Sequence, residues 1–204
     1  MNATIAADIA LALFAVFGVL GFGWRSWLQY RRTGSTGFRG MGGGATESIA
    51  GGGFVVALIV SASAPILQRA NIVEPVAALH EIWIQFAGIA VATAGIAATV
   101  YAQLAMGDSW RIGVDEQETT ALVHTGVFGL IRNPIYTSMF TFGLGIALLT
   151  PNLVACAGFI LLVTTIELQV RRVEEPYLLR THGEAYRGYT ARAGRFVPRV
   201  GLIR

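Results

Sequence analysis

Three charged side chains, Arg132, Glu174 and Glu175, lie directly beside apolar stretches of the sequence and could hold a small charged ligand. An arginine guanidinium can donate two parallel hydrogen bonds to a carboxylate or a phosphate. A pair of glutamates can accept hydrogen bonds from an ammonium group. These residues also have an ordinary explanation, because arginines anchor the ends of membrane helices and neighbouring glutamates are common on solvated helices. The residue types alone therefore leave both interpretations open.

Glu167 lies at the end of an apolar stretch, where an ionised side chain is unfavourable. Arg171 follows four residues later, and this order of charges favours an ion pair across one helical turn. Arg171 also precedes Glu174 by three residues and Glu175 by four, so either could be its partner instead. We expect the Glu167–Arg171 pair and give it a structural role.

Three tyrosines are placed so that they could line a binding site. Tyr136 falls in the first turn of a helix that Pro134 is expected to begin, since proline is favoured at that position. Gly183 is expected to end a helix, because glycine tolerates the backbone conformation found there. Tyr186 and Tyr189 follow it and share one face of the next short helix. An interfacial aromatic residue is the ordinary alternative for Tyr136.

The composition excludes most classes of soluble protein. Of 204 residues, 54% are hydrophobic and 13% are charged, about half the charged fraction of an average soluble domain. One cysteine permits no internal disulfide, and the three histidines lack the spacing of a metal site, so no metal is expected. The net charge of +3 comes from arginines beside apolar stretches, which favours membrane topology over nucleic-acid binding.

The apolar stretches predict an all-α, polytopic integral membrane bundle of about five transmembrane helices, forming one membrane domain over residues 1–204. Each stretch approaches the roughly 20 residues that cross a bilayer. Small residues in the third stretch, Gly88, Ala92, Gly95 and Thr99, predict a close packing face. The predicted spans are 5–24, 49–67, 82–106, 135–149 and 153–170.

The distribution of arginines predicts the orientation. Four arginines follow the first span, one follows the second, two follow the third, and eight lie in the C-terminal tail. Because cytoplasmic loops are enriched in basic residues, we expect the N-terminus outside and the C-terminus inside. Segments 107–134 and 171–204 would then both be cytoplasmic. The last two spans form a tight hairpin, which would bring these two polar segments together at one membrane face.

Four fragments in these segments resemble motifs of the isoprenylcysteine carboxyl methyltransferase family and its phospholipid methyltransferase relatives. Each fragment is short, but their order and spacing match the family together over roughly residues 100–199. The fragments are MGDSW (106–110), TGVFGLIRNPIY (125–136), EEPYLLRTHGEAYRGY (174–189) and GRFVP (194–198).

This resemblance implies an enzyme that uses S-adenosylmethionine as methyl donor and releases S-adenosylhomocysteine. The family binds this cofactor between the membrane surface and the C-terminal helices, without a metal. The resemblance places Arg132 and Glu174 as catalytic residues, with Arg132 orienting a carboxylate and Glu174 and Glu175 holding the cofactor ammonium. The full set of implied cofactor-binding residues is Gly126, Val127, Phe128, Arg132, Asn133, Pro134, Tyr136, Glu174, Glu175, Tyr186 and Tyr189.

The acceptor implied by the resemblance is a lipid or a lipophilic small molecule that enters from the bilayer. Two other functions remain open. Membrane reductases that use NADPH share an R-[HN]-P-x-Y segment, but the Tyr136-Thr137-Ser138-Met139 stretch and the E-E-x-x-L tail favour the methyltransferase. A non-catalytic membrane scaffold is compatible with the low charge and the glycine-rich helices.

Overall fold

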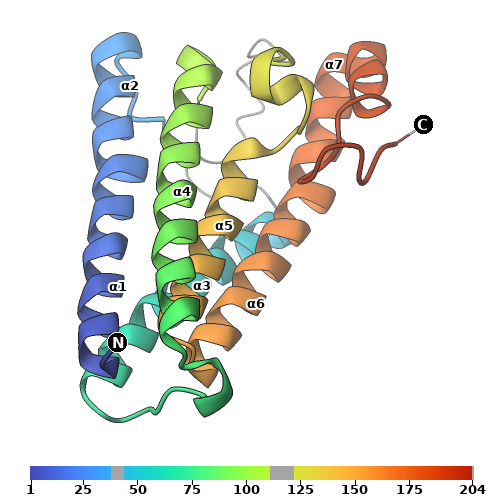
Figure 1. Ribbon diagram of the computed structural model, residues 1–204. Helices are drawn as coiled ribbons and strands as arrows, with labels where there is room; N and C mark the ends of the chain where they lie inside the picture. Colours follow the sequence, from blue (N-terminus) through green and yellow to red (C-terminus); the bar gives the residue numbers. More distant parts are fainter. Residues whose placement is uncertain (38–43, 111–121, 204) are drawn as a thin grey trace.

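The computed structural model describes residues 1–37, 44–110 and 122–203, which form a helical bundle (Figure 1). Short 3₁₀ turns lie in the connections: η2 (Ala77–Leu79), η3 (Gly107–Ser109) and η4 (Gly126–Gly129). The longer elements are α1 (Ala3–Gly18), the π-helical η1 (Val19–Trp24), α2 (Arg25–Thr33), α3 (Ala45–Arg69), α4 (Ile82–Met106), α5 (Pro134–Leu149), α6 (Leu153–Gln169), the π-helical η5 (Val170–Glu174) and α7 (Glu175–Thr190).

The first helix is longer than the sequence predicts. The first predicted span ends at residue 24, but α1, η1 and α2 form one continuous helix of 31 residues, Ala3–Thr33. Polarity marks the end of the apolar stretch and not the end of the helix, because neither proline nor glycine occurs between Trp24 and Gly34. Gly34 has φ +74°, the left-handed conformation that ends helices, and its N–H donates to the carbonyl of Tyr30.

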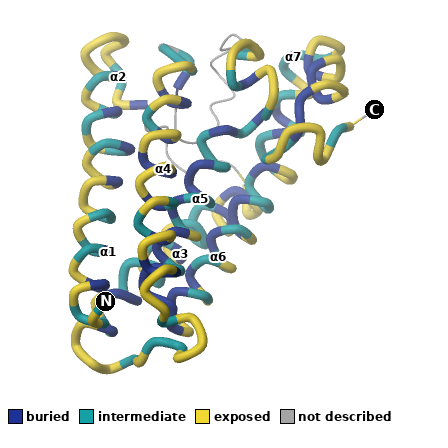
Figure 2. The backbone as a smooth tube through the Cα atoms, viewed as in Figure 1, coloured by how far each residue is buried: buried dark blue, intermediate teal, exposed yellow. Residues whose placement is uncertain are grey.

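Four of the helices in the described residues are long and apolar enough to cross a membrane, and α5 is a shorter apolar helix of 16 residues. The continuous helix Leu153–Thr190 has 38 residues, far more than one crossing needs. Its apolar part is α6, so we place η5 and α7 outside the membrane. Large apolar side chains cover the outside of the bundle, as Leu153 and Ile160 do at 79% and 65% exposure, and Figure 2 shows exposed outer faces along the helices.

The predicted packing face on α4 lies against α5 at close range. A Cβ atom added to Gly88 would come within 2.6 Å of the backbone nitrogen of Leu149, and one added to Gly95 would lie 2.5 Å from that of Phe142. On the facing side, a Cβ at Gly145 would overlap the backbone of Ala92. Small residues therefore let the two backbones touch, as in other membrane helix pairs.

The hairpin between α5 and α6 is held by buried polar groups at the end of the bundle opposite α7. The Asn152 side chain accepts from the N–H of Ala155 at 2.9 Å, which caps α6, and donates to the Gln68 side chain at 3.1 Å. Gln68 in turn donates to the carbonyl of Ala3 at 3.0 Å. These bonds tie α1, α3 and α6 together. The predicted tight hairpin is confirmed, because α5 ends at Leu149 and α6 begins at Leu153.

Arg25 links the N-terminal helix to the chain that follows α4. The side chain is 1% exposed and donates to the carbonyl of Gly107 at 2.6 Å. Its guanidinium also lies 4.6 Å from the centroid of the buried Trp110 ring. Gly37 also packs against this ring, and a Cβ atom added there would come within 2.7 Å of a carbon of the Trp110 ring. The MGDSW fragment is therefore fixed by the first helix.

Substituting Gly145 by alanine should destabilise the protein, because the added methyl has no space between α5 and α4. We expect a loss of about 1–3 kcal/mol, typical of overpacking. Gly52→Ala in α3 is the matched control, since nothing lies within 4 Å of the Cβ position there. Thermal unfolding in detergent should show a lower Tm for Gly145→Ala alone. Equal melting temperatures for both variants would contradict this packing.

Candidate active site

Two segments distant in sequence meet beside α7, at the end of the bundle opposite the α5–α6 hairpin (Figure 1). Ile131 and Gly194 form an isolated parallel β-bridge. The Arg132 N–H donates to the carbonyl of Gly194 at 2.7 Å, and the Gly194 N–H donates to the carbonyl of Leu130 at 3.0 Å. The predicted meeting of the two polar segments is therefore confirmed for their described residues. Part of the first segment, residues 111–121, lies outside the described part of the chain.

Arg132 is at the centre of this contact. Its side chain is 2% exposed, and one guanidinium nitrogen donates to Glu175 Oε1 at 2.7 Å. The same nitrogen also donates to the carbonyl of Gly201 at 3.0 Å, and the second terminal nitrogen donates to the carbonyls of Ala193 at 2.5 Å and Thr190 at 3.4 Å. Through these bonds the buried guanidinium joins the start of α5 to α7 and the C-terminal chain.

Glu175 accepts from two arginines. Besides Arg132, Arg195 donates to both of its carboxylate oxygens, at 2.8 and 2.9 Å. Burial would raise the pKa of the Glu175 carboxyl, but the hydrogen bonds from Arg195 and Arg132 outweigh burial and hold this pKa below its ordinary value. The Arg132–Glu175–Arg195 cluster is therefore ionised at neutral pH and carries a net positive charge.

Glu174 faces a different partner from its neighbour. The Tyr136 hydroxyl in the first turn of α5 donates to Glu174 Oε1 at 2.6 Å. Glu174 ends the π-helical η5, where each turn holds more residues than in an α-helix, and such segments are frequent at functional sites. Two adjacent glutamates thus lie in different settings: Glu175 is buried in the arginine cluster, whereas Glu174 is half-buried beside a tyrosine.

Two tyrosines of α7 close the site from the other side. The Tyr189 hydroxyl donates to the carbonyl of Phe128 at 2.6 Å, and the rings of Tyr186 and Tyr189 lie 6.1 Å apart. Burial raises the pKa of Tyr189 to about 12 and raises that of Tyr186 as well, so both remain neutral. Gly183 interrupts helical geometry here with φ +51°. The predicted helix end is therefore a kink, and Tyr189 beyond it contacts η4.

The η4 turn presents main-chain groups beside these tyrosines. Gly126 has φ +60° and nothing within 4 Å of its Cβ position, so this part of the backbone is open to a ligand. Val127 is half-buried, and Phe128 is buried at 4% exposure with its carbonyl held by Tyr189. Of these three residues, Gly126 therefore has the most accessible main chain.

The other predicted residues have mainly structural contacts. The Asn133 side-chain amide donates to the carbonyl of Arg195 at 3.2 Å, and Pro134 is buried at the first position of α5. Arg171 forms its ion pair with Glu167, as expected from their spacing.

The site also contains residues that the sequence did not single out as functional. Arg195 completes the ion-pair cluster, and Gly194 is packed so tightly that a Cβ would overlap the carbonyl of Val197. Both belong to the GRFVP fragment, whose place in the motif order was the available signal. Nothing in the sequence indicated that Arg132 would bind the carbonyls of this region.

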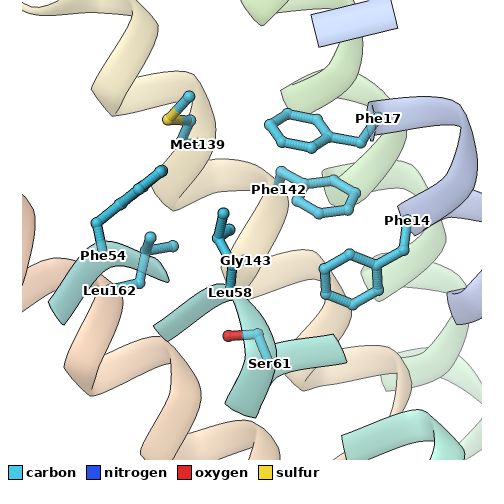
Figure 3. A pocket seen from close by; sticks show the side chains of 9 residues that line it. All are labelled: Phe14, Phe17, Phe54, Leu58, Ser61, Met139, Phe142, Gly143 and Leu162. Carbon is cyan, nitrogen blue, oxygen red and sulfur yellow. The ribbon is translucent and has the colours of Figure 1, made fainter. Parts of the chain in front are cut away.

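A separate small cavity lies inside the membrane part of the bundle (Figure 3). Its volume is about 20 Å³, enough for roughly one water molecule and too small for a lipid chain as it stands. None of the predicted site residues lines it. The lining side chains come from α1, α3, α5 and α6 and are Phe14, Phe17, Phe54, Leu58, Ser61, Met139, Phe142, Gly143 and Leu162.

The fold and site define a multi-pass membrane protein whose polar site is built where α5 begins and α7 follows α6. The model of the phospholipid methyltransferase family matches residues 83–185, just over half of the chain. The protein therefore belongs to the phospholipid methyltransferase family. Members of this family are methyltransferases that use S-adenosylmethionine.

The solved structure of the eukaryotic intramembrane Ras methyltransferase, isoprenylcysteine carboxyl methyltransferase, has a similar fold. The TM-score is 0.69 at 20% sequence identity, over 100% of this chain and 70% of that one. No curated protein sequence matches the chain. Family membership and this fold confirm the sequence resemblance, and they favour the methyltransferase over the reductase and the scaffold.

Substituting Glu175 by glutamine should change how stability depends on pH. The folded-state pKa of Glu175 lies below the unfolded value of about 4.3, so its contribution is complete above that value and is lost as the pH falls through the folded-state pKa. Removing one partner of a buried ion pair costs roughly 3–5 kcal/mol. The variant should therefore be much less stable at pH 6, with a gap that narrows below about pH 4.

Thermal unfolding between pH 3 and pH 7 measures this gap. Glu184→Gln is the control, because Glu184 is 83% exposed in its pair with Arg187 and should change stability little at any pH. A stability gap for Glu175→Gln that stays constant down to pH 3 would show that the carboxylate charge is not what holds the cluster.

Proposed function

We propose that this protein transfers a methyl group from S-adenosylmethionine to a lipophilic acceptor at the cytoplasmic face of the membrane. The observation that carries this proposal is the contact between the 126–136 and 174–195 segments through the Tyr136–Glu174 and Arg132–Glu175 pairs. It creates a polar site directly above membrane helices, with carboxylate, hydroxyl, aromatic and main-chain groups together.

The side chains around Glu174 fit the methyl donor chemically. The bound cofactor supplies an electrophilic methyl on a positively charged sulfonium, next to an ammonium group. A half-buried carboxylate attracts such cations, and the buried rings of Tyr186 and Tyr189 form an apolar wall close to it. We assign to Glu174 the binding of the cationic end, and to Gly126, Val127 and Phe128 the main-chain contacts.

Arg132 has a positioning role in this proposal. Its guanidinium already donates to Glu175 and to three carbonyls, so it acts through the elements that it joins. Glu175, with both oxygens bound to arginines, has the same role. Asn133 and Pro134 fix the start of α5, and thereby Tyr136. These residues hold the reacting groups in place, which is the main requirement of an in-line methyl transfer.

The place of the site favours an acceptor dissolved in the bilayer. Tyr136 lies in the first turn of the apolar α5, and Glu174 follows the apolar α6 by one short π-helical segment. An acceptor with an apolar body can stay in lipid while its oxygen or nitrogen reaches this level. The arginine distribution supports a cytoplasmic site, with the N-terminus outside and the C-terminus inside.

Substituting Glu174 by glutamine should weaken binding of S-adenosylhomocysteine at least tenfold, because the neutral amide no longer attracts the ligand ammonium. A tenfold change corresponds to about 1.4 kcal/mol. Isothermal titration of the purified protein in detergent measures it, with Glu184→Gln as the exposed control and NADPH as the control ligand. Equal affinity of Glu174→Gln and the parent would remove Glu174 from the site, and binding of NADPH alone would favour a reductase.

The acceptor class can be tested with radiolabelled S-adenosylmethionine and total membrane lipids. We expect label in the organic extract when the parent protein is present in bilayer nanodiscs, and at least a tenfold lower rate with Glu174→Gln. Label found only in water-soluble products would contradict a lipophilic acceptor.

A further inference from the structure

The chain after α7 descends beside the first two turns of α5. The Thr137 hydroxyl donates to the carbonyl of Phe196 at 2.8 Å, and the Phe196 ring lies 5.2 Å from that of Phe140. Thr137 and Phe140 are the fourth and seventh residues of the apolar α5. Phe196 therefore lies at the depth of a membrane helix and not above it.

The residues that follow Phe196 expose apolar side chains on the outer side of the chain. Val197, Val200 and Ile203 are 53%, 60% and 44% exposed, and Figure 2 shows the C-terminal stretch as mostly exposed. Apolar surface in water is unfavourable by about 25 cal/mol per Å². This stretch follows Phe196, which packs on the apolar α5, so lipid is the medium that covers it.

A turn in this stretch carries a basic residue at its tip. The Val200 N–H donates to the carbonyl of Val197 at 3.1 Å, and Arg199 between them has φ +63°. This left-handed conformation is uncommon for a residue with a side chain and places the exposed Arg199 at the corner of the turn. Residues 191–204 contain four arginines and no acidic residue.

We propose that the Val197–Val200 turn is an interfacial anchor that inserts its valines into the bilayer surface, with Arg199 among anionic lipid headgroups. The exposed valines continue the lipid-facing surface of the helices, and the arginine complements the negative charge of the headgroups. The occupant of this surface is therefore the anionic lipid interface and not a second copy of the chain.

This anchor is connected to the Arg132–Glu175–Arg195 cluster by the main chain. The carbonyls of Ala193 and Gly201, on either side of the turn, both accept from the Arg132 guanidinium. The N–H of Arg195 donates to the carbonyl of Val200 at 2.7 Å. Seating the turn in lipid restrains the same chain that surrounds Arg132. The inference does not depend on the methyl acceptor or on the role of Glu174.

Spin labels can locate the turn relative to the bilayer. Cys156 is the one cysteine of the sequence, so a Cys156→Ser background accepts a single label at Val197→Cys or Val200→Cys. The full-length protein is placed in nanodiscs containing phosphatidylglycerol, and each variant must unfold at the parent temperature. We expect labels at both positions to relax more with oxygen than with a water-soluble nickel chelate. A label at the highly exposed Glu184→Cys, the control, should show the opposite order.

Two results would overturn the proposal. Nickel accessibility at Val197→Cys and Val200→Cys equal to that of the control would place the turn in water. Strong dipolar coupling between labels of two copies would assign the surface to a second chain.

The headgroup contact is tested separately. A label at Val200→Cys should lie deeper in phosphatidylglycerol discs than in phosphatidylcholine discs. Adding Arg199→Gln should remove this difference. Equal depth in both lipids without that substitution would exclude the headgroup contact.

Discussion

The buried ion pair between Arg132 and Glu175 is the contact on which the rest of the site depends. Both side chains are removed from water, at 2% and 10% exposure, so each requires the other. Both terminal nitrogens of the guanidinium also bind carbonyls of the C-terminal chain, and Arg195 donates to both oxygens of the carboxylate. Segments more than forty residues apart are thereby fixed to one another.

The membrane bundle determines where this ion pair can form. Glycines on α4 and α5 bring those helices into backbone contact, and a polar hairpin at the far end returns the chain through α6. The start of α5 and the segment after α6 therefore lie at the same level, where the Tyr136 hydroxyl is 2.6 Å from Glu174 Oε1. The π-helical η5 then directs Glu174 and Glu175 to different partners. One glutamate holds the architecture, and the other remains beside a tyrosine at the proposed ligand site.

The sequence predicted the helical membrane fold, the small-residue face and the meeting of the polar segments, because hydropathy, hairpin spacing and motif order report these directly. It did not predict that the first helix would continue past Arg25, whose charge is accommodated by a carbonyl and the Trp110 ring. Nor could the sequence predict that Glu174 and Glu175 have different partners. That difference follows from the π-helical turn η5, which no residue type in the segment indicates. The binding of Arg132 to main-chain carbonyls also leaves no signature in residue types.

In the proposed site Glu174, and not Arg132, meets the charged end of the cofactor between η4 and α7. A structure of the protein with S-adenosylhomocysteine tests this most directly. We expect the ligand ammonium within hydrogen-bonding distance of the Glu174 carboxylate, its adenosine near η4 and the α7 tyrosines, and the Arg132–Glu175 pair intact. A ligand whose carboxylate replaces Glu175 on the Arg132 guanidinium, or one bound elsewhere in the bundle, would contradict it.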